Sequence, residues 1–245
     1  MKYVLKFLVV VLLASYLIYV FVAISGKRSE DVCQTVDVII ADSQRVGFIT
    51  PEVVENILKR AKLTPIGKNM DDINGNEIET QLKKNSFINN AVCYKSPGGR
   101  LGIIIEQRLP IMRIMSNDGD NYYIDGGGNS MPHSGYCADL VVATGHITRS
   151  FASKELLKIG LFLKYDDFWN NQIEQIDVQQ DGTIDFVSRV GGQIIHIGNA
   201  NNLEQKLNNM MAFYEKVIPT VGWNKYTRFN VEHTNQVICT IQEAN

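Results

Sequence analysis

The sequence has little of what enzymes and nucleic-acid-binding proteins usually display. Its four histidines are all more than five residues apart, and no two of its four cysteines lie at metal-ligand spacing. The P-loop, G-x-G-x-x-G and nucleophile-elbow patterns are absent. The formal net charge of -2 provides no strongly basic field for nucleic acid. We therefore expect no catalytic residue, no cofactor, no metal ion and no nucleic-acid partner.

The long hydrophobic run lies near the N-terminus. From Phe7 to Gly26 there are 20 consecutive uncharged residues, and a helix of that length spans roughly 30 Å of bilayer hydrocarbon. The run exceeds the roughly 7 to 15 residues of a signal-peptide core, so an uncleaved anchor is favoured. A small-residue pattern at Ala23 and Ser25 keeps a cleaved signal peptide as the alternative. We expect residues 1–6 to form a cytoplasmic tail and everything after Gly26 to be exported.

The four cysteines are Cys33, Cys93, Cys137 and Cys239. In an oxidising compartment they allow three pairings. Cys33 and Cys93 flank or lie in predicted strands of one unit, so a Cys33–Cys93 disulfide is the pairing we expect if one forms. Four buried free thiols are the alternative.

A polar linker at 27–34 leads into a first folded unit, which we expect to span residues 35–109. Thr50 and Pro51 predict a helix start, because threonine caps and proline suits the first helical position. Pro97-Gly98-Gly99 predicts a turn between two strands. The expected order is β-α-α-β-β, with strands at 36–40, 91–95 and 101–107 and helices from 51 and at 77–85.

Pro110 cannot donate to a strand ladder, so we place the start of a second, mixed β domain there, at residues 110–245. Expected strands lie at 111–115, 121–125, 140–143, 173–178, 183–187, 193–197, 227–232 and 236–241, and helices at 153–165 and 202–218. Leu203, Leu207, Met210, Tyr214 and Val217 recur at helical spacing in the last helix. A core-facing stripe explains them better than a coiled coil, because Pro219 ends the pattern after about two heptads. His196, between Ile195 and Ile197, is expected to face solvent.

The stretch GDNYYIDGGGNSMP at residues 119–132 resembles a ligand-binding loop. Asp125 precedes three glycines, but Asp118 and Asp120 suggest a turn rather than further metal ligands. A phosphate cradle would need a helix start after the glycines, and residues 129–132 do not provide one. We expect a strand that ends in a glycine turn with positive φ.

Several segments in order resemble the FtsQ/DivIB family of bacterial division proteins, particularly members from Bacteroidetes. The run Glu106–Pro110 matches an x-Q-R-x-P segment that leaves the first exported domain of that family. Tyr122–Asp125, with Gly128 and Pro132, matches the strand that follows it. The terminal run Phe229–Cys239 also fits.

The resemblance implies an α+β fold: a single N-terminal transmembrane helix at 7–26, a POTRA-like β-α-α-β-β domain, and then a mixed β domain with flanking helices. It implies a non-enzymatic divisome scaffold of the inner membrane, located at the septum with its folded domains in the periplasm. The implied partners are bitopic coiled-coil proteins of the FtsB/DivIC and FtsL types, and through them the septal transpeptidase/glycosyltransferase complex. The expected contact is a partner strand added to the C-terminal strand. The partner-binding residues it implies are Phe229, Val231, Glu232, His233, Gln236, Val237 and Ile238.

Two other functions remain as alternatives. A POTRA-bearing envelope assembly factor would show several POTRA repeats or a C-terminal barrel, and the sequence has neither pattern. A membrane-anchored enzyme would use the Asp125 glycine loop.

Overall fold

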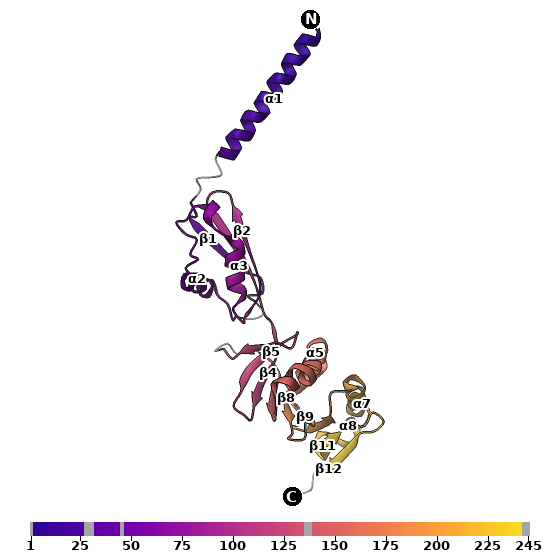
Figure 1. Cartoon of the computed structure of the whole chain (residues 1–245). Coiled ribbons are helices and arrows are strands. Elements are labelled where there is room, and N and C mark those ends of the chain that lie inside the picture. The colour runs from indigo at the N-terminus through magenta and orange to yellow at the C-terminus, as the bar shows by residue number, and fades with distance from the viewer. Residues whose placement is uncertain (1, 27–31, 45–46, 135–138, 242–245) are drawn as a thin grey trace. The chain divides into compact units, whose positions relative to one another are not determined.

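The computed structural model describes residues 2–26, 32–44, 47–134 and 139–241 (Figure 1). The chain forms two compact units, Met1–Gln107 and Arg108–Asn245. Helices and strands occur in both, and the α+β class expected from the sequence is confirmed.

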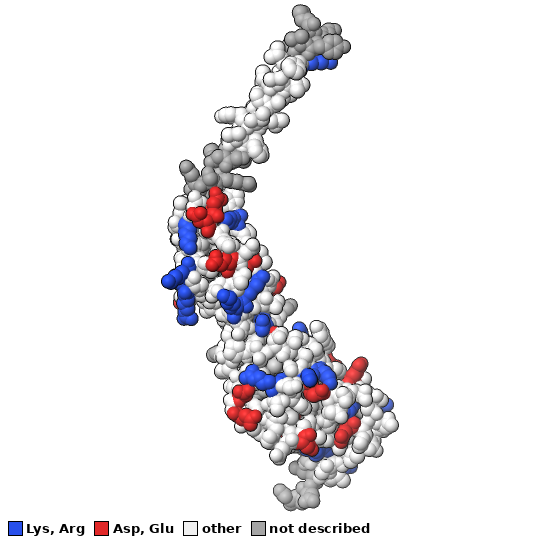
Figure 2. All heavy atoms as spheres, viewed as in Figure 1, with Lys and Arg blue, Asp and Glu red and all other residues white. Residues whose placement is uncertain are grey.

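Helix α1 covers Lys2–Gly26 (Figure 1). Its large apolar side chains are exposed, with Phe7 71% and Phe21 74% accessible. In the space-filling view the described part of this helix is almost entirely uncharged (Figure 2). Across the described ranges, no helix combines the length and the apolar character that crossing a membrane requires.

After α1, the first unit has the predicted β-α-α-β-β order, with one additional 3₁₀ turn. Its three strands pair in the order β1-β3-β2, with β1 parallel and β2 antiparallel to the central β3. The elements are β1 (Thr35–Ile40), α2 (Pro51–Arg60), η1 (Met70–Asp72), α3 (Gly75–Lys83), β2 (Ile88–Ser96) and β3 (Arg100–Gln107).

Local capping explains where the two helices begin. Thr50 Oγ1 accepts the Val53 N–H at 3.4 Å, with Pro51 at the first helical position as predicted. Asn74 Oδ1 accepts the Glu77 N–H at 3.3 Å at the start of α3. Both caps satisfy amides that the helix leaves unpaired. The helices then bury their apolar faces in a core with β3.

The second unit contains one nine-stranded sheet in the order β12-β11-β10-β9-β8-β7-β4-β5-β6. Its strands are β4 (Pro110–Ser116), β5 (Asn121–Asp125), β6 (Ser130–Pro132), β7 (Val142–Gly145), β8 (Ile173–Val178), β9 (Ile184–Ser188), β10 (Ile194–Gly198), β11 (Tyr226–Asn230) and β12 (Ile238–Ile241). Its helices are α4 (Arg149–Phe151), the π-helical η2 (Ala152–Leu156), α5 (Leu157–Tyr165), α6 (Asp167–Gln172), α7 (Leu203–Lys216), α8 (Ile218–Val221) and the 3₁₀ turn η3 (Trp223–Lys225).

Some boundaries differ from the sequence-based expectations. Pro110 is the first residue of β4, a position where the missing N–H costs little. The strand expected at 140–143 lies two residues later. The short elements β6 and α6 were not predicted, because three to six residues are too few to show a hydrophobic period.

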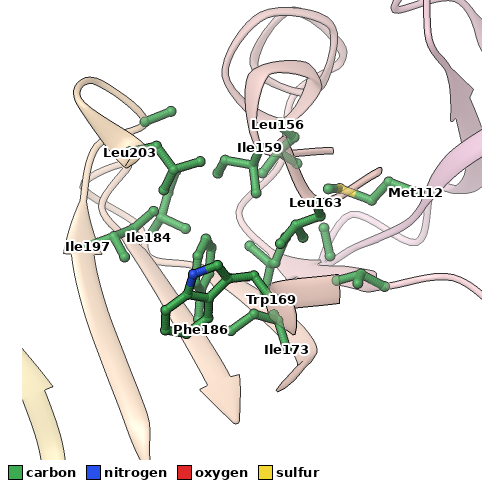
Figure 3. Close-up of a cluster of buried hydrophobic side chains, with 14 of the residues drawn as sticks. Met112, Leu156, Ile159, Leu163, Trp169, Ile173, Ile184, Phe186, Ile197 and Leu203 are labelled. Atoms are coloured by element: carbon green, nitrogen blue, oxygen red, sulfur yellow. The ribbon is translucent and has the colours of Figure 1, made fainter. Parts of the chain in front are cut away.

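The core of this unit lies between one face of the sheet and the helices. Trp169 from α6 packs beside Phe186 and Ile173 from the sheet, with Leu163 from α5 nearby (Figure 3). All four side chains are at most 2% exposed. Burying an aliphatic or aromatic side chain of this size contributes roughly 1.5 to 3 kcal/mol.

The stripe predicted in the 202–218 helix is a core stripe. Leu203, Leu207, Met210 and Tyr214 of α7 are all buried against the sheet, so the coiled-coil alternative is wrong for this helix. Val217 does not continue it, because α7 ends at Lys216.

Candidate functional site: the C-terminal edge and the sheet face beside it

Asp125 organises the glycine turn. Its Oδ1 accepts the backbone N–H groups of Gly127 at 2.9 Å and Asn129 at 2.8 Å. Its Oδ2 lies 3.5 Å from Arg108 Nε, and Gly128 has the predicted positive φ of 77°. A carboxylate engaged in these contacts is holding a turn, as the sequence predicted. Within the described residues, no group of three or more His, Cys, Asp or Glu side chains is placed to hold a metal ion.

The C-terminal strand β12 is an edge of the nine-stranded sheet. It pairs antiparallel with β11, from Asn230↔Ile238 to Tyr226↔Ile241, and the described chain has no strand on its other side. Ile238 is 50% and Ile241 63% exposed. An edge of this kind presents unpaired backbone groups together with apolar side chains.

The seven residues expected to bind a partner fall into two groups. Phe229 and Val231 are fully buried, so their side chains belong to the core. The ring centroids of Phe229 and Phe213 are 5.2 Å apart. The remaining five lie in or next to the turn before β12. His233, Gln236 and Ile238 are exposed there, and Glu232 and Val237 are partly exposed.

The turn before β12 is fixed to the rest of the unit. Asn209 of α7 donates its side-chain amide to the Thr234 carbonyl at 2.5 Å. The Glu232 N–H donates to Asn230 Oδ1 at 2.9 Å. The Glu232 side chain lies over Gly198, where a Cβ atom would come within 2.7 Å of its Cγ. These contacts hold the start of β12 in place.

A charged network beside this turn was not predicted. His196 Nδ1 lies 2.6 Å from Asp185 Oδ1, and one terminal nitrogen of Arg228 donates to both Asp185 oxygens at 2.9 and 3.0 Å. His196 Nε2 lies 3.8 Å from Glu232 Oε2. The His196 side chain is only 14% exposed, so the expected solvent-facing histidine is instead held between two carboxylates. The alternation of His196 with two isoleucines did place it opposite the core.

The thiols of Cys33 and Cys93 are free in the structure, as is that of Cys239. Burial raises the pKa of the Cys93 thiol to about 11, and nearby Glu79 adds to the shift. The Cys33–Cys93 disulfide stays a prediction. Cys137 lies outside the described residues.

Comparisons with known protein families match both units. The family model described as FtsQ/DivIB, C-terminal related, matches residues 109–240, which is more than half of the chain. The chain belongs to the FtsQ/DivIB family. A model described as a POTRA-like domain matches residues 31–106. No protein with a curated description matches the chain. Membership implies a role in cell division within a family of non-catalytic scaffolds, and it confirms the resemblance seen in the sequence.

Proposed function

We propose that this FtsQ/DivIB protein is a membrane-anchored, non-enzymatic divisome scaffold that binds a partner by strand addition at β12. The proposed partners are bitopic coiled-coil proteins of the FtsB/DivIC and FtsL types, which would link it to the septal peptidoglycan synthesis machinery. The contact residues we propose are Glu232, His233, Gln236, Val237 and Ile238, with β12 supplying the main-chain hydrogen bonds.

The observation that carries this proposal is the difference between the two edges of the sheet. At one edge, β6 has three residues and ends in Pro132, and short edge strands containing proline resist strand addition. At the other edge, β12 reads Ile-Cys-Thr-Ile, with no charge and no proline. Exposed, uncharged and β-prone residues at an edge are a liability unless another strand covers them.

We further propose that residues 7–26 anchor the chain in the inner membrane, with 1–6 in the cytoplasm and units at 35–109 and 110–245 in the periplasm. The 20-residue uncharged run and its exposed side chains support an anchor, whereas α1 as described is not long and apolar enough to cross a membrane. Alkaline extraction of cell membranes separates these possibilities. A spanning helix keeps the chain in the membrane pellet, and a Leu12→Lys/Ile18→Lys variant should release it.

Photo-crosslinking in living cells tests the binding edge. A photoreactive residue at Ile238 in the full-length chain should capture a small single-pass protein. The matched control is Tyr165, which is 79% exposed at the end of α5 and distant in sequence from the edge. Equal capture of the same protein from both positions, or no capture from Ile238, would argue against strand addition at β12.

A further inference from the structure

The sheet face opposite the core carries an ordered row of side chains that ends at β12. The strand registers align one residue from each of six adjacent strands, from β7 across to β12. Side chains aligned in this way point to the same face. The row consists of Thr144, Asp177, Asp185, His196, Asn230 and Ile238. Ile238 is one of the proposed contact residues, so the row and the binding edge form one continuous surface.

A hollow of about 600 Å³ lies in the middle of this face. Asp177 of β8 and Asp185 of β9 line it, together with Arg228 of β11 and neighbouring residues. No helix residue of the described chain is among its lining residues. The hollow is therefore an uncovered part of the sheet.

The charges in the hollow do not balance within the described chain. Asp177 and Asp185 lie directly opposite each other in the antiparallel β8–β9 pair, an arrangement that destabilises a sheet. Arg228 and His196 contact Asp185. Within the described residues, Asp177 accepts only the Thr144 hydroxyl at 3.0 Å and the Gln179 amide at 2.6 Å, and it forms no ion pair with a Lys, Arg or His among them. One carboxylate of the pair thus lacks a cation.

We infer that this face is an interaction surface, and that its hollow receives a lysine or arginine side chain from the same partner segment that adds to β12. This inference rests on the proposed function, because it needs a segment at the β12 edge. Because Asp177 carries a negative charge without an ion-pair partner in the described chain, the partner's side chain should be positively charged. The row of side chains that ends at Ile238 connects the hollow with the β12 edge.

Strand spacing sets where the basic residue must lie in the partner. Adjacent strands are about 4.8 Å apart, so β9 and β8 lie roughly 19 to 24 Å across the face from a strand added beyond β12. An extended chain advances about 3.3 Å per residue, and a long basic side chain reaches several ångströms further. The lysine or arginine should therefore lie roughly four to seven residues from the added strand.

The first test uses the full-length chain in living cells, with a photoreactive residue at Gln175 in the hollow or at Ile238 on the edge. We expect both positions to capture the same protein. Peptide mapping should place the Gln175 crosslink beside a lysine or arginine, roughly four to seven residues from the Ile238 crosslink. Capture from Ile238 alone would overturn the inference and leave the proposed function standing. Failure at both positions would remove the proposed function and the inference with it.

The second test measures the affinity of the captured, purified partner. Asp177→Asn should weaken binding about tenfold and Asp177→Lys by about a hundredfold or more, because each removes or reverses a charge pair. The control Glu204→Gln, at an exposed position on α7, should leave affinity unchanged. Unchanged binding by Asp177→Asn would overturn the inference. So would binding that is lost in a chelator and restored by Ca²⁺, since the hollow would then hold a metal ion.

A stability measurement guards against misfolding of the variant. Without its partner, Asp177→Asn should unfold at the same or a higher temperature than the unmodified chain, because it removes the repulsion between opposed carboxylates. A lower unfolding temperature would contradict the charge argument.

Discussion

Lys206 provides the sharpest test of how α7 is attached to the sheet. Its side chain is almost fully buried, and its Nζ donates to the carbonyl oxygens of Ile197 at 2.8 Å and Asn199 at 2.9 Å. Lys206→Met keeps the length and apolar character of the stem but removes the donor. Both carbonyl groups then lose a partner, at a cost of about 1 to 3 kcal/mol for each that stays away from water.

Two effects reduce that cost. The Asn199 carbonyl is only partly buried, so water can replace the lost donor there. Folding must also remove water from the Lys206 ammonium group, which lowers the pKa of Lys206 in the folded chain. Methionine has no ammonium group and avoids this desolvation. We therefore expect Lys206→Met to lower the free energy of unfolding by about 2 kcal/mol, with the lost hydrogen bonds outweighing the relief of burial.

Urea unfolding followed by tryptophan fluorescence measures this loss in the full-length chain. Both tryptophans, Trp169 and Trp223, lie in the second unit, so the signal reports that unit. The exposed Lys216 of the same helix gives the control Lys216→Met, which should change stability by less than about 0.5 kcal/mol. A Lys206→Met variant as stable as the unmodified chain would refute the reasoning.

The pH dependence of stability gives an independent check on the direction of the Lys206 pKa shift. Burial lowers the pKa of Lys206 in the folded chain below the ordinary lysine value of 10.5. At pH values between the two, the folded chain binds fewer protons at this group than the unfolded chain does. The unmodified chain should therefore gain stability relative to Lys206→Met as the pH rises toward 10.5.

Three other outcomes follow from the structure. Asp125→Ala should lower the free energy of unfolding by about 1 to 3 kcal/mol, because two turn amides lose their acceptor. Partner affinity per folded molecule should stay unchanged, and a loss of affinity with normal stability would favour a ligand-binding loop. Because its pKa of about 11 leaves less thiolate, Cys93 should react with an alkylating agent at pH 8 about a hundredfold more slowly than a thiol of pKa 9. Mass spectrometry follows this reaction. Gly102→Ala should lower the thermal midpoint of the first unit, because the new Cβ would meet the Tyr94 ring. The double variant Gly102→Ala/Tyr94→Ala should show a smaller decrease in the midpoint than the sum of the decreases in the two single variants.

Local sequence patterns predicted the elements whose signals are local. The cap at Thr50 and the turn at Pro97-Gly98-Gly99 located the first unit's helix start and hairpin, and the core stripe from Leu203 to Tyr214 located α7. These features depend on residues within a few positions of each other. The strand at 142–145 was misplaced because its short run, Val-Ala-Thr-Gly, has weak alternation.

The charged network could not be predicted from sequence, because its members are far apart in the chain. Asp185 and Arg228 are separated by 43 residues and meet only through the β9–β10–β11 arrangement. The parallel pairing of β10 with β11 is itself non-local, since α7 and α8 lie between the two strands. No periodicity in the sequence encodes such a pairing, and only the assembled sheet shows that His196, Asp185 and Arg228 form one site.

The second unit retains two features that are unfavourable in an isolated chain, and they occur on one continuous surface. An uncharged edge strand favours unwanted pairing, and two opposed carboxylates repel each other across β8 and β9. Selection against aggregation would place a lysine or a proline on the edge, where Pro132 lies on the opposite edge. Selection for stability would replace Asp177. The proposed partner, by adding a strand to β12 and placing a basic side chain over Asp177, would cover the edge and neutralise the unpaired carboxylate. Under that proposal, the repulsion that the isolated chain carries between Asp177 and Asp185 would be regained as binding free energy in the complex.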